Sequence, residues 1–140
     1  MEIKVTYREE QAPVTILAPQ GELTADSAAS FEAAAAAAIE RGARYLVLDL
    51  AATPYIGSFG IRAINSVLVA LHAAADGYSE AELRQAMRGG SKSPRLKLAA
   101  VNPQSMKVLE TSGFDMYLEV YRTVDEAVRS FHKETVGGGR

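Results

Sequence analysis

One segment limits the possible folds more than any other. Residues 45–50 read YLVLDL, a short and almost unbroken apolar run. A strand with one face in water alternates apolar and polar residues, whereas a continuous apolar run is typical of a central strand covered on both faces. Such a strand needs helices packed against it on both sides. The segment therefore favours an α/β fold.

Apolar periodicity elsewhere in the chain predicts the remaining elements. Alternation with period two predicts strands at residues 3–7 and 116–120, and two further apolar stretches predict strands at 14–18 and 96–101. Apolar residues at helical spacing predict four helices, at residues 28–40, 58–71, 103–112 and 124–131. With a further short helix in an insert, the expected order is ββαβα(α)βαβα. This is a mixed β-sheet of about five strands packed with about four helices.

The first predicted helix is unusual for its six consecutive alanines, residues 33–38. Alanine is the strongest helix former, and its small side chain lets a helix approach a sheet closely. We expect Phe31, Ala35, Ala38 and Ile39 to share the face that packs on the core. Asp26 or Ser27 is expected to cap the start of the helix.

Residues 76–94 interrupt the regular pattern. Ser79 and Glu82 form a capping-box pattern that predicts a short helix ending at the glycine pair 89–90. Residues 89–94 are expected to form a mobile loop. The insert either shapes the choice of partner or is a tolerated loop, because long loops add little entropic cost. We expect a single domain over residues 1–134 and a disordered tail at 135–140.

Composition excludes several classes of function. The chain contains no cysteine, which rules out disulfides and thiolate chemistry. Its 15 basic and 17 acidic residues give a net charge of −2, so no basic surface for nucleic acid is expected. The N-terminus lacks the pattern of a signal peptide, and no apolar run looks long enough to insert into a membrane. A cytoplasmic protein is the simplest expectation.

No residue pattern indicates an enzyme. The two histidines, His72 and His132, are expected at ordinary surface positions on helices, without carboxylates at metal-ligand spacing. No serine, histidine and acid occur in a recognised nucleophile–base spacing. Gly57 and Gly60 lack the remaining residues of a phosphate-binding loop. We therefore expect no catalysis, no metal and no cofactor.

Three stretches of the sequence resemble the STAS family. Residues 21–23 read GEL, a turn into the first helix. Residues 46–50 (LVLDL) lead into 55–60 (YIGSFG), which is similar to the family's strand–loop–helix element. Residues 108–114 read VLETSGF, similar to the family's ending of the third helix. The motifs occur in the family's order across residues 3–132, so the resemblance implies a STAS-like fold.

The resemblance is to the anti-sigma factor antagonist branch of that family, which consists of bacterial transcription regulators. In that branch a serine is phosphorylated by a partner that is both a serine kinase and an anti-sigma factor, and the partner uses the ATP. The matching serine is Ser58. The resemblance implies a protein partner of this kind, contacting Thr24, Gly57, Ser58, Phe59 and Arg62. A phosphate at a helix start would meet unpaired N–H groups, so the fold should tolerate it while the interface would not.

The chain departs from the family's pattern beside Ser58. Gly57 replaces the usual aspartate, and Phe59 replaces the usual small residue. Ser58 is therefore either a phosphorylation site or a plain helix cap. Phe59 is either a core residue, which we favour, or an exposed binding anchor. Asp49 is expected to support the loop that carries Ser58.

Two other functions remain open. One is an unphosphorylated stand-alone STAS subunit of a transport or lipid-trafficking complex, which the altered residues at 57 and 59 favour. The other is a ligand-sensing module that uses a groove near Ser58, with the insert 76–94 as its lid.

Overall fold

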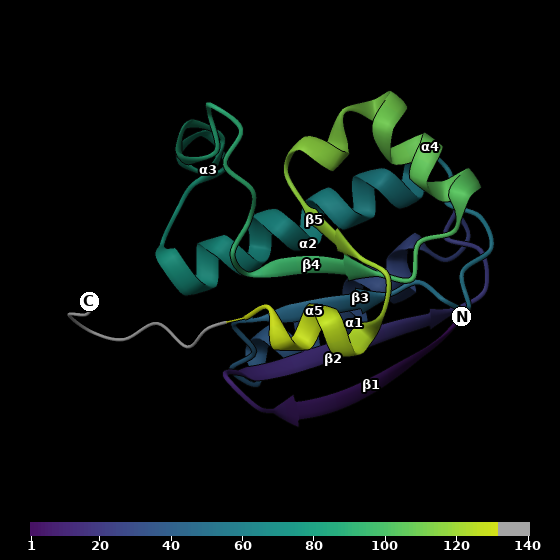
Figure 1. The fold of residues 1–140 in the computed structure, drawn as a ribbon, viewed down its shortest axis with the longest axis horizontal. Helices are drawn as coiled ribbons and strands as arrows, with labels where there is room; N and C mark the ends of the chain where they lie inside the picture. Colours follow the sequence, from purple (N-terminus) through teal and green to yellow (C-terminus); the bar gives the residue numbers. More distant parts are fainter. Residues whose placement is uncertain (132–140) are drawn as a thin grey trace.

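A five-stranded sheet forms the centre of the molecule, in the computed structural model that describes residues 1–131. Strand order follows chain order, from β1 (Glu2–Glu9), β2 (Pro13–Gln20) and β3 (Leu46–Asp49) to β4 (Leu96–Ala99) and β5 (Glu119–Tyr121) (Figure 1). β1 is antiparallel to β2, and each later pair of neighbours is parallel. The predicted mixed α/β fold is confirmed.

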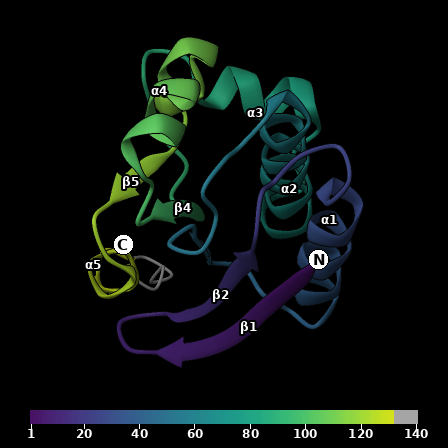
Figure 2. The same cartoon turned by 90° about the vertical axis from the view of Figure 1, so that its right-hand side faces the viewer.

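Helices cover both faces of this sheet. Residues 1–131 contain five α-helices, namely α1 (Ala28–Glu40), α2 (Ser58–Asp76), α3 (Glu80–Ala86), α4 (Pro103–Ser112) and α5 (Val124–Arg129). Figure 2 shows α1 and α2 on one side of the sheet and α5 on the other, with α3 and α4 at the end away from β1. Four of these helices were expected from apolar periodicity, and the fifth is the short helix α3 that was expected in the insert.

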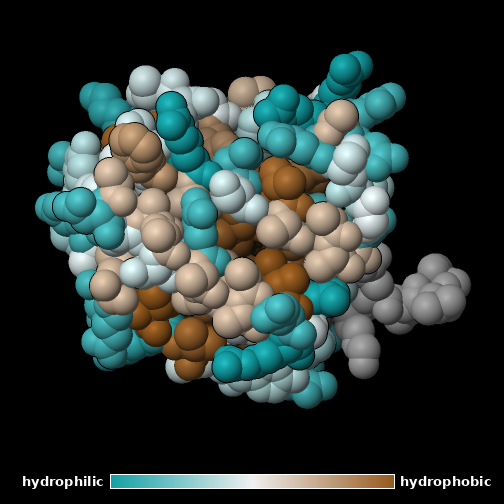
Figure 3. All heavy atoms as spheres, turned by 180° about the vertical axis from the view of Figure 1, so that it is seen from behind, coloured by the Kyte–Doolittle hydropathy of each residue, from teal (hydrophilic) through white to brown (hydrophobic). Residues whose placement is uncertain are grey.

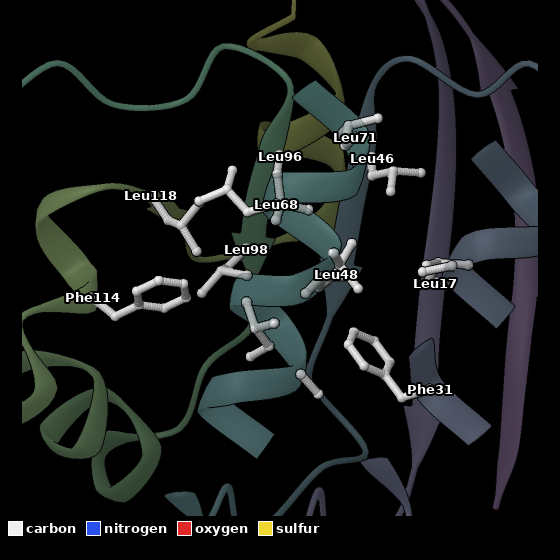
Figure 4. Close-up of a cluster of buried hydrophobic side chains, with 14 of the residues drawn as sticks. Leu17, Phe31, Leu46, Leu48, Leu68, Leu71, Leu96, Leu98, Phe114 and Leu118 are labelled. Atoms are coloured by element: carbon white, nitrogen blue, oxygen red, sulfur yellow. The ribbon is translucent and has the colours of Figure 1, made fainter. Parts of the chain in front are cut away.

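β3 is buried on both faces, as its apolar run predicts. Leu46 and Leu48 belong to the larger core, where leucines of the sheet meet α1 and α2 (Figure 4). Val47 points to the opposite face and joins a smaller cluster under α5. There Tyr45 and Phe131 pack edge to face, with ring centroids 5.3 Å apart. The strand therefore lies inside the molecule with no face left for water.

The alanine-rich helix α1 buries one narrow face. Phe31, Ala35 and Ala38 are buried as predicted. Ala33 and Ala36 face outward. Figure 3 shows the side of the molecule that α1 and α2 cover, where weakly hydrophobic and hydrophobic residues gather and hydrophilic ones lie mainly near the rim.

We expected no segment long and apolar enough to cross a membrane, and helix α2 shows that this expectation was wrong. The helix has 19 residues, and 18 consecutive residues within it have a mean hydropathy of 1.3, which meets that requirement by length and composition alone. Its apolar stripe packs in the core instead, through Ile64, Val67, Leu68 and Leu71.

Several predicted helix caps are confirmed, but α3 ends at Ala86, before the predicted glycine pair 89–90. Ser79 caps α3 with the full capping box, Asn102 caps α4 with a proline at the first position, and α4 ends at Gly113 in the left-handed conformation. The cap of α1 is different. Ser27 holds the N-cap position but makes no capping bond to the helix, because its Oγ donates to the carbonyl of Glu22 and accepts from the N–H of Thr24. The predicted cap at Asp26 is therefore wrong as well.

The last strand begins later than predicted. Residues 114–116 form a short 3-10 helix, η1 (Phe114–Met116), and β5 covers only Glu119–Tyr121. Phe114 turns inward after the left-handed Gly113 and joins the core. Met116, expected in the strand, is 59% exposed. The predicted domain limit at 134 and the tail 135–140 lie outside the described residues.

Candidate functional site

The loop between β3 and α2 is joined to the turn after β2 by backbone hydrogen bonds. The N–H of Gly21 donates to the carbonyl of Ala52 at 3.0 Å, and that of Leu23 donates to Tyr55 at 2.9 Å. The N–H of Gly57 in turn donates to Leu23 at 2.9 Å, next to an isolated parallel bridge between Leu23 and Ile56. Two segments more than 30 residues apart thus form one rigid frame just before α2.

Gly60 lets α2 start against this frame. A Cβ atom at position 60 would lie 2.4 Å from the carbonyl oxygen of Leu23 and 3.0 Å from Cγ2 of Ile56. No side-chain carbon approaches a backbone oxygen so closely. The glycine is therefore required for close packing, and the frame fixes the first turn of α2.

Ser58 is the first residue of α2, and Gly57 holds the N-cap position. The interpretation of Ser58 as a helix cap is therefore wrong. Its side chain is exposed, and within residues 1–131 its hydroxyl forms none of the hydrogen bonds found for other side chains. The first turn of a helix also carries N–H groups without intrahelical partners and a partial positive charge. The hydroxyl is open to a modifying enzyme and suits a negative group.

Phe59 lies outside the core, contrary to the interpretation that we favoured. Its side chain is 51% exposed. The guanidinium of Arg62, one turn further along α2, lies 5.2 Å from the centre of its ring. Tyr55, before the helix, is 39% exposed. The start of α2 thus presents two aromatic side chains and a cation around Ser58.

Thr24 reaches the same surface from the other segment of the frame. Its Cγ2 lies 3.9 Å from the place where a Cβ of residue 57 would be. The structure therefore brings the five predicted contact residues to one surface, Thr24 and Gly57 through the frame and Ser58, Phe59 and Arg62 through α2. Their role in partner binding stays a prediction.

A groove lies beside Ser58, as the ligand-sensing alternative requires, although its wall from α4 was not predicted. It has a volume of about 490 Å³ and lies between the start of α2 and α4. Tyr55 and Ile61 line one side, and Lys107 and Thr111 line the other. Most of its wall is apolar, with Lys107 as its cation. The insert 76–94 contributes no residue to it and lines a separate groove of about 700 Å³ with Leu83 and Met87. The expected lid over Ser58 is therefore wrong.

Asp49 acts on the loop, as predicted. Its Oδ1 accepts a hydrogen bond of 3.1 Å from the N–H of Ala51. Thr53 is buried and donates to the carbonyl of Pro19 at 3.1 Å, while Asn102 donates to the carbonyl of Pro54 at 3.0 Å. These bonds hold the whole loop that leads to Ser58.

A second polar cluster lies at the opposite end of α2, and it corrects the surface position expected for His72. This histidine is 3% exposed. Its Nδ1 lies 2.7 Å from Oδ2 of Asp76, and its Nε2 lies 2.8 Å from Oγ of Ser93. Arg95 donates to both carboxylate oxygens of Asp76, at 3.0 and 2.9 Å. His132 lies outside the described residues.

The hydrogen bonds of Ser93 define the proton positions in this cluster. Its Oγ accepts from the N–H groups of Arg95 and Leu96, both at 3.1 Å. The hydroxyl proton therefore points to Nε2 of His72, and Nδ1 carries the imidazole proton and donates it to Asp76. Burial lowers the pKa of His72 and keeps the ring neutral. Burial acts to raise the pKa of Asp76, but hydrogen bonds from Arg95 and His72 outweigh it and lower that pKa.

Ser93, His72 and Asp76 are hydrogen-bonded in the order of a hydrolase triad, an arrangement that no recognised sequence spacing indicated. Ser93 is only 1% exposed, however. Its oxygen already accepts two backbone N–H groups, which leaves no approach for a substrate carbonyl. The cluster instead fixes the end of the insert, where a mobile loop was expected. The sequence feature that could have predicted this cluster is the spacing of His72 and Asp76, which lie four residues apart on one helix face.

Metal binding finds no support in the described part of the chain. Among residues 1–131, no group of three or more His, Cys, Asp or Glu side chains gathers as a metal ion needs.

Comparison with known proteins agrees with this geometry. A model of the STAS domain matches residues 6–75, half of the 140-residue chain. The matched part contains the turn after β2, the loop and the whole apolar stripe of α2 with Ser58 at its start. The chain belongs to the STAS domain family. No curated protein matches it in sequence.

Solved structures show the same fold. An anti-sigma factor antagonist from Mycobacterium paratuberculosis matches with a TM-score of 0.65 and 19% identity, over 92% of this chain and 93% of the other. The Bacillus cell fate determinant SpoIIAA in its phosphorylated form matches with a TM-score of 0.60 and 18% identity, over 91% and 97%. A sulfate transporter family protein from Wolinella succinogenes matches with a TM-score of 0.57 and 18% identity, over 83% and 82%.

Proposed function

We propose that this chain is a cytoplasmic switch of the anti-sigma factor antagonist type. In this proposal its unmodified Ser58 surface binds an anti-sigma factor that is also a serine kinase. The kinase transfers the terminal phosphoryl group of its own ATP to Oγ of Ser58, and the modified chain is released. The observation that carries the proposal is the exposed, unpaired hydroxyl of Ser58 on the first turn of α2.

The surroundings of Ser58 support a binding surface. Exposed aromatic rings and arginine are the residue types that contribute most at protein interfaces. Phe59 and Arg62 supply both in one contact, and Tyr55 adds a second exposed ring. The frame beneath them is rigid, so little conformational entropy is lost when a partner binds.

A phosphate on Ser58 would change this surface without unfolding the protein. It adds a charge of about −1.5 to −2 at neutral pH. The start of α2 attracts negative charge, and the exposed Arg62 follows on the same helix. A partner surface that had closed over the neutral hydroxyl would instead have to bury the charge, which costs several kcal/mol. The expected effect is release of the partner with the fold intact.

An unphosphorylated subunit of a transport complex is the second candidate. Gly57 and Phe59 depart from the pattern that the antagonist branch has beside its serine, and a sulfate transporter family protein shares the fold. In that case the same exposed Phe59 surface would bind its complex permanently, and Ser58 would carry no phosphate.

Mass spectrometry of the protein purified from its own host separates these two functions. Ser66 is the matched control, because it is an exposed serine on the same helix, two turns further on. Phosphate on Ser58 but not on Ser66, in growing or stressed cells, is expected for the switch. An unmodified Ser58 under every condition would refute it and favour the permanent subunit.

Two variants then test the mechanism. Ser58→Ala keeps the neutral surface and should capture the kinase permanently, whereas Ser58→Asp should lose it. Both should unfold at nearly the wild-type urea concentration, because the side chain is exposed. Capture of the same kinase by both variants would show that charge at position 58 does not control binding.

A further inference from the structure

β1 is a long edge strand with nothing beyond it. It has eight residues and occupies one end of the sheet order, and no described element lies outside it in either view (Figures 1 and 2). The outer row of its N–H and C=O groups is therefore free to pair with another strand. Most of its side chains are exposed too, with Val5 at 49% and Tyr7 at 62%, while Ile3 and Arg8 are partly buried.

Sheet geometry restricts how two copies of β1 could pair about a two-fold axis. Such a pair is antiparallel, and alternate residues of each strand point their backbone groups outward. Residues whose N–H and C=O groups point outward must face each other across the strand pair. The residue numbers of any two facing residues therefore add up to an even number. The middle of the strand lies between Val5 and Thr6, so the two most central registers are centred on these residues, and each pairs seven residues of β1.

Charge selects one of these two registers. The register centred on Thr6 places Lys4 opposite Arg8 of the other copy. Like charges directly opposite each other destabilise a strand pair. The register centred on Val5 avoids this contact and matches residues of complementary kind: Glu2 with Arg8, Ile3 with Tyr7, Lys4 with Thr6, and Val5 with itself.

We propose that this chain forms a two-fold symmetric dimer through antiparallel pairing of β1 with β1 of a second copy, centred on Val5. The two sheets then form one continuous ten-stranded sheet. Ile3, Val5 and Tyr7 make an apolar row across the junction on one face. On the other face, Glu2 of one copy joins Arg8 of its partner, which already pairs with Glu10 and Asp125 of its own chain.

The dimer leaves the Ser58 surface free. Ser58 starts α2, which lies over the middle strands, and the groove beside it is lined by α4 at the end of the sheet away from β1. A single strand pair is smaller than a standard protein interface, so the dimer should be weak and dependent on concentration.

Sedimentation velocity over about a hundredfold range of protein concentration tests the assembly. The wild type should shift from monomer to dimer. Val5→Lys places two lysines face to face and should weaken the dimer at least about tenfold, as should Glu2→Lys, which places a lysine opposite Arg8. Ala33→Lys, on the exposed side of α1, is the control and should leave it unchanged.

Cysteine cross-linking tests the register, since the chain has no native cysteine. Under mild oxidation Val5→Cys should give a disulfide-linked dimer, because the two thiols face each other. In Tyr7→Cys the two thiols are four residues apart along the strands, roughly 13 Å, which a disulfide cannot span. Tyr7 is the more exposed of the two side chains. If cross-linking came from random collision, Tyr7→Cys would therefore be linked at least as readily as Val5→Cys.

Three results would overturn the proposal. A wild type that stays monomeric at every concentration excludes the dimer. Full dimerisation of Val5→Lys places the interface elsewhere. Equal cross-linking of Val5→Cys and Tyr7→Cys excludes the register centred on Val5.

Discussion

Gly60→Ala tests the frame beneath Ser58 most directly. Alanine is a better helix former than glycine by about 1 kcal/mol, so propensity alone predicts a more stable protein. The structure predicts the opposite sign. The new methyl carbon would lie 2.4 Å from the carbonyl oxygen of Leu23, about 0.9 Å closer than an ordinary C···O contact.

The size of the stability loss depends on which atoms can move to relieve the contact. The oxygen that the methyl group meets belongs to the backbone of Leu23, which also accepts the hydrogen bond from Gly57. Relief therefore requires the first turn of α2 to shift away from the frame. Overpacking of this kind costs about 3 kcal/mol, and the gain in propensity offsets about 1 kcal/mol. We expect a net loss near 2 kcal/mol, or a fall in Tm of roughly 6 °C.

Urea unfolding followed by circular dichroism measures this loss, with Ala70→Gly as the matched control. Ala70 is exposed in the middle of α2 and measures propensity alone, so that variant should lose about 1 kcal/mol. If Gly60→Ala gains about as much stability as Ala70→Gly loses, position 60 has room for a methyl group and the close contact with Leu23 does not exist.

Other parts of the structure give four further predictions. The free energy of unfolding should fall as the pH drops below about 6.5, the ordinary pKa of histidine, because burial lowers the pKa of His72 and the unfolded chain then binds more protons. In urea unfolding repeated at several pH values, His72→Gln should remove most of this dependence of the unfolding free energy on pH. Ser93→Ala should cost about 3 kcal/mol in urea unfolding, since it leaves two buried N–H groups and an imidazole nitrogen unpaired. Phe59→Ala should cost about 1 kcal/mol in urea unfolding, well below the loss for a buried phenylalanine, because the ring is half exposed. Gly57→Asp should raise the free energy of unfolding by a few tenths of a kcal/mol, because a carboxylate at the N-cap accepts helix N–H groups.

The fold could be predicted because its signals are local. The apolar run of β3 required cover on both faces, and the core provides it from both sides. Caps at Ser79 and Asn102 were found because each acts within three residues of its own position. The motif around Ser58 placed the start of α2 correctly to within one residue.

The parts that the sequence did not predict depend on contacts between distant residues. Ser93 meets His72 across 21 positions, and nothing in either neighbourhood indicates that contact. Lys107 reaches the groove at Ser58 from α4, and only the packing of two helices brings them together. Phe59 was misassigned because an apolar residue on a helix usually faces the core.

The frame explains how the chain can belong to the STAS family and still differ beside its serine. The hydrogen bonds that hold residue 57 in place are made by its backbone: its N–H donates to Leu23, and its carbonyl accepts from the N–H of Ile61. Its φ of −92° is one that any residue can adopt, and the side chain of Phe59 is half exposed beside Arg62. Gly60 alone touches it so closely that no side chain fits. The fold therefore constrains residue 60 and leaves residues 57 and 59 free to vary, so those two positions can adapt to a partner without a change of structure. We therefore infer that the partner of the Ser58 surface determines which residues occupy positions 57 and 59. Gly57 and Phe59 leave the fold that presents Ser58 intact.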